Sequence, residues 1–389
     1  MNVLIVTAMF PPIRTGTSFY SKNLAQALQA RGHQTTLVTL QNNELDGAVY
    51  DFPVHRLKAM HIPAHNYFKH FRISSVYLQN YRELNRIAKH CKAEVILLVN
   101  HYLDIAFPAI ATARLNKIPL VCSVGTQIQS SNPRRDKLLN ILDRAICGRI
   151  FAFCDQIIAW DKQIYQYIQD VHSQKSVNKT TIVNYGINGD PALFVEHDHD
   201  YKLQNQILGV GAVIEQRSFI PLIHAFKALR PLFPELRLKI IGHVYYDAAV
   251  KLTQQLGLSA YVTFTGELPH AEVLAELKRS DLFFSSLTGK YLGLGTATIE
   301  SMLMGVPTIV NAPADLLGGP LLQHMENIVL SEGLDISQIE EKIRLLLSSL
   351  PLRKKIGEQG RQFILEHMNW EKVAEKMEGE FATLVQARS

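Results

Sequence analysis

The chain has 389 residues, of which 47% are hydrophobic and 19% are charged, and its formal net charge is +5. This balance excludes a disordered or fibrous chain, and the length predicts two domains. The four cysteines form neither a C-x-x-C pair nor a zinc-binding spacing, so we expect free thiols in a reducing compartment.

The first half of the chain alternates between strand and helix patterns. Val3–Ala8 is a short apolar strand rather than a signal peptide, because no basic residue precedes it and a turn follows directly. A helix from Ser18 to Arg31 and the strand Gln34–Leu40 complete a βαβ unit, which predicts a parallel sheet. Further strands are predicted at Val95–Val99, Pro119–Ser123, Gln156–Ala159 and Thr181–Val183.

The second half repeats this alternation. A strand at Gln206–Gly211 precedes a helix from Ser218 to Leu232, and a last helix runs from Trp370 to Val385. No run of about 18 apolar residues that could span a membrane occurs, so we expect a cytoplasmic protein. Further strands are predicted at Leu236–Ile241, Val262–Thr265, Leu282–Ser285 and Pro307–Val310.

The predicted fold class is α/β, with two doubly wound, Rossmann-like parallel-sheet domains that face a cleft. We assign residues 1–185 to the first domain and residues 206–368 to the second. The polar stretch 186–205 is the predicted linker and hinge, and residues 369–389 form a helix that crosses back to the first domain. Such sheets bind ligands beyond the carboxyl ends of their strands, so loops that follow strands are the candidate sites.

Charge is unevenly distributed along the chain. Residues 1–185 carry 21 Lys and Arg against 11 Asp and Glu, a net +10, whereas the remainder carries 19 against 24, a net −5. No nucleic-acid-binding motif is present, so an anionic membrane surface is the favoured partner of the basic half and nucleic acid is not expected. The segments Arg56–Lys92 and Arg134–Phe151 interleave basic and apolar residues and could lie on a bilayer. Alternatively, their apolar faces pack on the sheet and their charges are solvated.

Gly16 stands just before a predicted helix, in the loop FPPIRTGTSFY. The free N–H groups and the dipole of a helix N-terminus attract phosphates and oxyanions, so this loop is a candidate anion site. A glycine that only permits a tight turn is the alternative.

Several longer stretches resemble family 4 glycosyltransferases with the GT-B fold. The opening strand, the PPIRTG loop and the helix ending in RGH resemble the start of that family, with Thr17 in place of a second glycine. ILGVGAVIEQRSFIPLIHAF resembles the opening of its donor domain, GKYLGLGTATIESMLMGVPTIV its donor-site segment, and HMNWEKVAEKM its closing helix. The resemblance spans nearly the whole chain, in the family's order.

The resemblance implies a GT-B enzyme that moves a sugar from a nucleotide-diphosphate sugar to a glycan or lipid-linked acceptor, with retention of configuration. It implies a role in cell-surface polysaccharide or glycolipid synthesis, an acceptor-side first domain and a donor-binding second domain. No metal and no cofactor are expected. With the basic first domain, this points to a cytoplasmic protein at the inner face of the membrane.

The resemblance also implies site residues. Glu300 matches the second glutamate of an E-x7-E pair and is expected to hold the ribose, whereas Arg217 stands where the family has a diphosphate-binding lysine. His101 follows the strand Val95–Val99 and is predicted to face the cleft, although a structural histidine is the alternative. The expected catalytic residues are His101 and Glu300. The expected donor-binding residues are Gly16, Thr17, Arg217, Lys290, Gly293, Leu294, Gly295, Thr296 and Glu300.

Three positions depart from the family pattern. The first glutamate of the pair falls at Leu292, the arginine of the basic pair at Ala212, and a histidine that usually follows a first-domain strand at Gly125. Each departure removes a polar contact around the sugar or the diphosphate. They motivate the alternative of a catalytically impaired relative that binds a nucleotide or glycan without turnover. A GT-B epimerase or phosphorylase is a further alternative.

Overall fold

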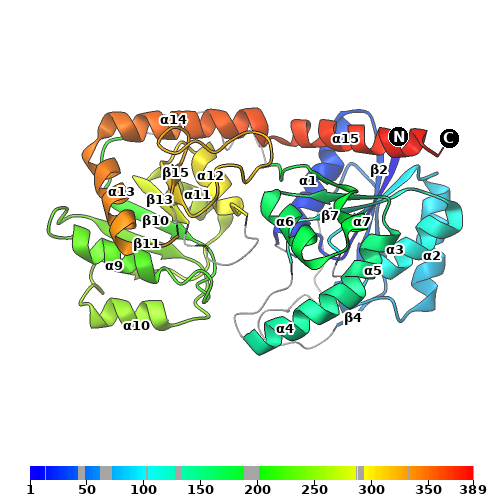
Figure 1. The fold of residues 1–389 in the computed structure, drawn as a ribbon, viewed down its shortest axis with the longest axis horizontal. Coiled ribbons are helices and arrows are strands. Elements are labelled where there is room, and N and C mark those ends of the chain that lie inside the picture. Colours follow the sequence, from blue (N-terminus) through cyan, green and yellow to red (C-terminus); the bar gives the residue numbers. More distant parts are fainter. Residues whose placement is uncertain are drawn as a thin grey trace. The chain divides into compact units, whose positions relative to one another are not determined.

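The computed structural model describes residues 1–13, 15–42, 49–61, 72–101, 104–127, 133–187, 201–285, 287, 293–331 and 333–388. The chain divides into two compact units (Figure 1). The first unit joins Met1–Asn188 to Trp370–Ser389, and the second is Gly189–Asn369. Each unit holds one large parallel sheet, which confirms the predicted α/β class.

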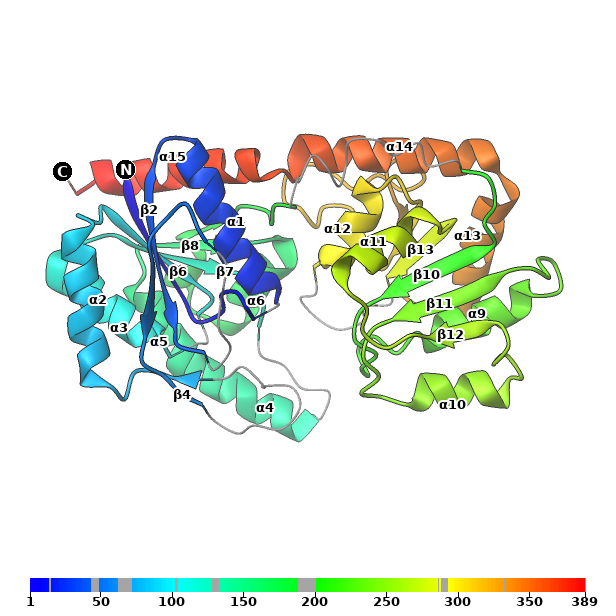
Figure 2. The same ribbon diagram turned by 180° about the vertical axis from the view of Figure 1, so that it is seen from behind.

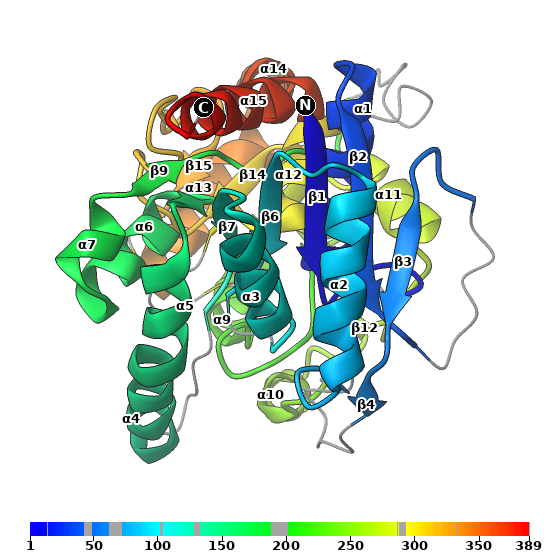
Figure 3. The same ribbon diagram turned by 90° about the vertical axis from the view of Figure 1, so that its right-hand side faces the viewer.

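The sheet of the first unit reverses its strand order beside its first strand (Figure 3). Such a reversal is a topological switch point, where loops leave the sheet in opposite directions and open a crevice. The central strands are mostly apolar, because helices cover both faces of the sheet. Their order is β3 (Val54–Leu57), β2 (Gln34–Leu40), β1 (Asn2–Thr7), β6 (Val95–Val99), β7 (Leu120–Val124), β8 (Gln156–Ala159) and β9 (Thr180–Ile182), all parallel.

The predicted strands of this unit lie within one residue of the observed ones, but β3 and two short strands were not predicted. β3 lies at the sheet edge and is mostly half-buried, so it lacks the apolar run that marks the central strands. The strands β4 (Met60–His61) and β5 (Arg72–Ile73) form a separate antiparallel pair. The helices are α1 (Gly16–Ala30), α2 (Leu78–His90), α3 (Ala106–Asn116), α4 (Pro133–Leu142), the π-helix η1 (Asp143–Cys147), α5 (Gly148–Phe153), α6 (Lys162–Val171), α7 (Gln174–Val177) and α15 (Trp370–Gln386).

The sheet of the second unit has the same design (Figure 2). Its first strand, β10 (Gln206–Val210), lies between β11 (Arg237–Ile241) and β13 (Leu282–Ser285), so the order reverses there. The other strands are β12 (Val262–Phe264) beyond β11, and β14 (Thr308–Val310) and β15 (Val329–Leu330) beyond β13. The helices are α9 (Ile220–Leu229), α10 (Ala248–Gln255), α11 (His270–Lys278), α12 (Thr296–Leu303), α13 (Ile336–Ser348) and α14 (Leu350–His367).

The C-terminal helix α15 packs on the core of the first unit, beside α1. Its apolar face is buried through Val373, Met377 and Phe381. Glu378 accepts a hydrogen bond from Arg31 at 2.7 Å, which joins α15 to the end of α1. The sheet of this unit is therefore covered by a segment more than 180 residues away from the rest of the unit.

The predicted linker falls mostly outside the described residues, which omit 188–200. None of the described helices has the length and apolar character that a membrane span requires.

Replacing Phe381 by Ala tests the packing of α15. Phe381 is fully buried, so we expect the substitution to lower the free energy of unfolding by about 3–5 kcal/mol. Both tryptophans of the chain, Trp160 and Trp370, lie in the first unit, so tryptophan fluorescence during urea unfolding reports on it. The control Lys376→Ala, at an exposed site of the same helix, should leave the transition unchanged. A Phe381→Ala transition that coincides with the wild type would contradict this packing.

Candidate active site

In the second unit, the loop that follows β10 places a charged side chain at the carboxyl end of the strand. Gly211 adopts φ +135°, and the Arg217 guanidinium lies so close that a Cβ atom at position 211 would be 2.5 Å from its Nη1. Arg217 is half-buried, and burial lowers its pKa. In the described part of the chain no carboxylate pairs with it. Among the described residues, this edge of the sheet thus carries a positive charge without a carboxylate counter-ion.

The neighbouring strand β13 leads to α12, whose first turn faces the same edge, because parallel neighbours end together. Gly295 is the N-cap residue at φ +77°, and none of the described side chains caps the first-turn N–H groups. No described side chain therefore competes with an anion for these N–H groups. Gly293 is half-buried and Thr296 is exposed, whereas the Leu294 side chain is buried, so Leu294 could offer a ligand only its backbone. Lys290 and Leu292 lie outside the described residues.

Glu300, on α12, pairs with His270, the first residue of α11. The Nε2 atom of His270 lies 2.9 Å from Glu300 Oε1, and the hydrogen bond raises the pKa of His270 above its ordinary 6.5. The Glu300 side chain is 18% exposed and that of His270 is 59% exposed, so the pair lies at the surface with the carboxylate on the inner side. His270 was not predicted as a site residue, because nothing in the sequence links it to a residue 30 positions away.

In the first unit, the predicted anion site at α1 is partly occupied by the protein itself. Thr15 Oγ1 caps the helix by accepting a hydrogen bond from Ser18 N at 3.2 Å. Gly16 is exposed, and a Cβ atom there would meet nothing within 4 Å, so the loop is open around it. The Thr17 side chain is buried, and its Oγ1 accepts a hydrogen bond from Asn100 Nδ2 at 2.7 Å.

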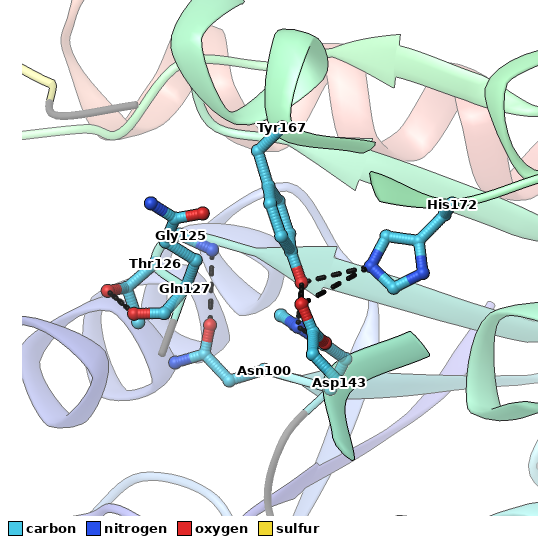
Figure 4. A network of polar contacts seen from close by, with 8 residues as sticks. Asn100, Gly125, Thr126, Gln127, Asp143, Tyr167 and His172 are labelled. Carbon is cyan, nitrogen blue, oxygen red and sulfur yellow. Dashed lines mark hydrogen bonds and ion pairs between the residues drawn. The ribbon is translucent and has the colours of Figure 1, made fainter. Parts of the chain in front are cut away.

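Asn100 joins the segments that follow three strands at the carboxyl edge of this sheet. It follows β6, is fully buried and adopts the left-handed φ of +65°, which asparagine tolerates better than most residues. Besides its bond to Thr17 after β1, its Oδ1 accepts from Gly125 N after β7 at 3.1 Å (Figure 4). Asn100 was not predicted as a site residue, whereas its neighbour His101 was.

That neighbour, His101, does not occupy the accessible position that we predicted. It is fully buried, and burial lowers its pKa to about 3, so the ring is neutral at physiological pH. Its Nε2 lies 3.0 Å from Tyr167 Oη. The Tyr167 hydroxyl donates to Asp143 at 2.6 Å and also lies 3.0 Å from His172 Nε2 (Figure 4). A direct contact between His101 and a substrate would require this packed network to open.

His101, Asp143 and Cys147 are the group of metal-ligating side chains that the described residues bring together, with ligand atoms within 4.8 Å of one another. The Tyr167 hydroxyl already bonds to Asp143 and His101, so a metal ion would have to displace it. The group is buried among helices rather than at an open edge. This arrangement fits a hydrogen-bonded core better than a reactive metal centre, and metal independence stays a prediction.

The departure at Gly125 has a steric cause. A Cβ atom at this position would lie 2.0 Å from Trp160 Cε3. The indole of Trp160 is held in place, because its Nε1 donates to Ser123 Oγ at 2.7 Å and its ring stacks on Tyr20 at 4.3 Å. Trp160 thus occupies the space that a histidine at position 125 would need.

We expect Gly125→His to destabilise the first unit by about 3 kcal/mol, because the new side chain would overlap the indole. In a Trp160→Ala background the same substitution should cost much less, since the obstacle is gone. Thermal unfolding of the two single variants and the double variant measures this coupling. Equal costs in both backgrounds would show that Trp160 is not what excludes the histidine.

We expect the contribution of the His270–Glu300 pair to stability to depend on pH. Because the folded-state pKa of His270 is raised, the pair contributes stability below the unfolded pKa of about 6.5 and loses it as pH rises through the folded value. An NMR titration of the His270 ring should give a midpoint above 6.5 that falls in Glu300→Gln. The same midpoint in both proteins would mean that the pair does not form in solution.

Known protein families match both units of the chain. The family model described as Glycosyltransferase Family 4 matches residues 14–190, and the one described as Glycosyl transferases group 1 matches residues 196–363. A glycosyltransferase of Haemophilus influenzae is 22% identical and covers 94% of this chain and 95% of its own. The alpha-monoglucosyldiacylglycerol synthase of Acholeplasma laidlawii is 23% identical, over 80% of each chain.

Solved structures share the fold. The sucrose-phosphate synthase of Thermosynechococcus elongatus superposes with a TM-score of 0.75 at 18% identity and covers 100% of both chains. HepE of Anabaena in complex with UDP-glucose gives a TM-score of 0.68 at 13% identity, covering 98% of this chain and 100% of its own. The family matches, the relatives and the two switch-point sheets agree, and the chain belongs to the group 1, family 4 glycosyltransferases, sugar-transferring enzymes with the GT-B fold.

Proposed function

We propose that this chain transfers a sugar from a nucleotide-diphosphate sugar to a lipid-linked or glycan acceptor, with retention of configuration and without a metal ion. The observation that carries the proposal is the environment of the Arg217 guanidinium. A half-buried guanidinium with no carboxylate partner among the described residues has lost hydration without gaining a counter-charge. An anionic ligand at the carboxyl edge of β10 would supply that charge.

The leaving diphosphate would meet two complementary groups there. Breaking the bond between sugar and phosphate increases the negative charge on the diphosphate, and aimed cations and N–H dipoles stabilise that charge. Arg217 supplies the cation, and the uncapped first turn of α12 supplies the N–H groups. Gly295, with its positive φ, brings the backbone close to the phosphates. Lys290 stays a prediction for a second cation.

Glu300 would hold the ribose. A carboxylate accepts two hydrogen bonds from a diol, and Oε2 of Glu300 has no bond to any described residue, whereas Oε1 is paired with His270. His270 would keep the carboxylate ionised and oriented, which makes it a positioning residue. HepE, a structural neighbour, is described in complex with UDP-glucose, which supports a nucleotide sugar as donor.

We propose a lipid-linked acceptor at the inner face of the membrane. Two observations support it: the net +10 of residues 1–185, and a relative named as an alpha-monoglucosyldiacylglycerol synthase. A protein that binds the nucleotide without turnover is the second candidate, favoured by the indole of Trp160 beside Gly125, where the family has a histidine.

Calorimetric titration with UDP, GDP, ADP and their sugar conjugates tests the donor site. We expect one nucleotide to bind, and Arg217→Ala and Glu300→Ala each to weaken binding by about 10- to 100-fold, the value of a charged hydrogen bond. The control Arg344→Ala removes an exposed arginine of α13 and should bind like the wild type. Binding that is unchanged in both variants would contradict this donor site. Tight binding without transfer to any lipid or glycan acceptor would favour the second candidate.

A further inference from the structure

The helical run α4–η1–α5 of the first unit exposes large apolar side chains, although its inner side also buries Cys147, Ile150 and Phe151. Toward the rest of the unit it turns Asp136 and Asn140, which are half-buried, and Asp143, which is buried. Toward solvent it turns four large apolar side chains that are 45–57% exposed. These are Leu138, Ile141, Leu142 and Ile146.

The four apolar residues form one stripe. Their spacing of three, four and eight residues from Leu138 places them along one side of a helix. A helix that packs only on its own domain turns such a stripe inward, as α2 does with the buried Leu84 and Ile87. A contiguous exposed apolar stripe instead indicates a surface that contacts something else. The first helix of the run, α4, extends beyond the sheet of its unit (Figure 3).

Buried contacts fix this orientation. Asp143 accepts the hydrogen bond from Tyr167 at 2.6 Å, and its Oδ2 lies 3.6 Å from His172 Nε2. Turning the run about its axis to hide Leu138 and Ile141 would pull Asp143 out of this network. Leaving a buried charge without its partners is costly, so the network holds the apolar stripe outward.

The charges around the stripe are positive. Arg134, Lys137, Arg144 and Arg149 are exposed on the run, whereas its two acidic residues, Asp136 and Asp143, are half-buried and buried. An apolar stripe with basic residues at its sides and ends complements an anionic lipid surface, where apolar groups enter the acyl boundary and basic groups meet phosphates. A second copy of this chain fits less well, because a symmetric contact would bring the same positive charges together.

We propose that residues 134–149 dock the first unit on an anionic lipid bilayer. Leu138, Ile141, Leu142 and Ile146 would insert at the boundary between headgroups and acyl chains. The four basic residues would contact lipid phosphates. Docking would bring the enzyme to a lipid-linked acceptor. Only this role, and not the docking itself, rests on the proposed function.

Flotation of the full chain with vesicles tests the proposal. We expect binding to phosphatidylglycerol–phosphatidylcholine vesicles and much weaker binding to phosphatidylcholine alone. The double variant Leu138→Ser/Ile141→Ser should bind about tenfold more weakly or worse, because two large apolar groups no longer insert. The double variant Lys137→Gln/Arg144→Gln should lose the preference for anionic vesicles and its dependence on salt. The control Leu345→Ser changes a leucine on α13 that is 45% exposed, like Leu142, and should bind as the wild type does.

All these side chains are exposed, so the variants should melt at the wild-type temperature. Binding that is absent in the wild type, or unchanged in Leu138→Ser/Ile141→Ser, would overturn the proposal. A wild-type dimer that this variant converts to a monomer, without vesicle binding by either, would assign the stripe to self-association instead. Nucleotide titration of the same samples separates the two proposals: vesicle binding without nucleotide binding would remove the donor site and leave this surface intact.

Discussion

The reversal of strand order beside the first strand of each sheet is the constraint on which the candidate site depends. Connections from the two strands at a reversal leave in opposite directions, so their carboxyl ends are not covered by a crossing helix. The candidate residues follow these four strands. Gly16 and His101 come after β1 and β6, and Arg217 and the Gly293–Thr296 turn come after β10 and β13. The strand order of each sheet thus places these residues at its carboxyl edge, whatever contacts their side chains make.

Electrostatics then distinguishes the two edges. In the second unit, Arg217 is desolvated and no carboxylate of the described residues pairs with it, and no described side chain caps the first turn of α12. In the first unit, the comparable groups bond within the protein: Thr15 caps α1, Asn100 joins the segments after three strands, and His101 is packed against Tyr167. The described groups of the second unit could therefore bind an anion. The described groups at the edge of the first unit instead hold its segments together.

Strand and helix patterns predicted the two sheets well, because hydrophobic periodicity is a local property. The edge strand β3 was not predicted, since a half-buried strand has only a weak apolar pattern. The site was predicted only where a motif is local, as for Glu300 and the glycine turn. His270, Asn100 and Trp160 act through partners 25 to 140 residues away, and no local pattern marks such pairs. His101 was misplaced for the same reason: its position after a strand was visible, but the packing that buries it comes from Phe151, Tyr167 and His172.

The central claim is that the edge formed by β10 and β13 receives the nucleotide diphosphate. A crystal structure of the chain with the nucleotide diphosphate that it binds tests this most directly. The account predicts the diphosphate between the Arg217 guanidinium and the first turn of α12, with the ribose hydroxyls on Glu300. A nucleotide that lies elsewhere, with Arg217 still folded against Gly211 and α12 unoccupied, would contradict it.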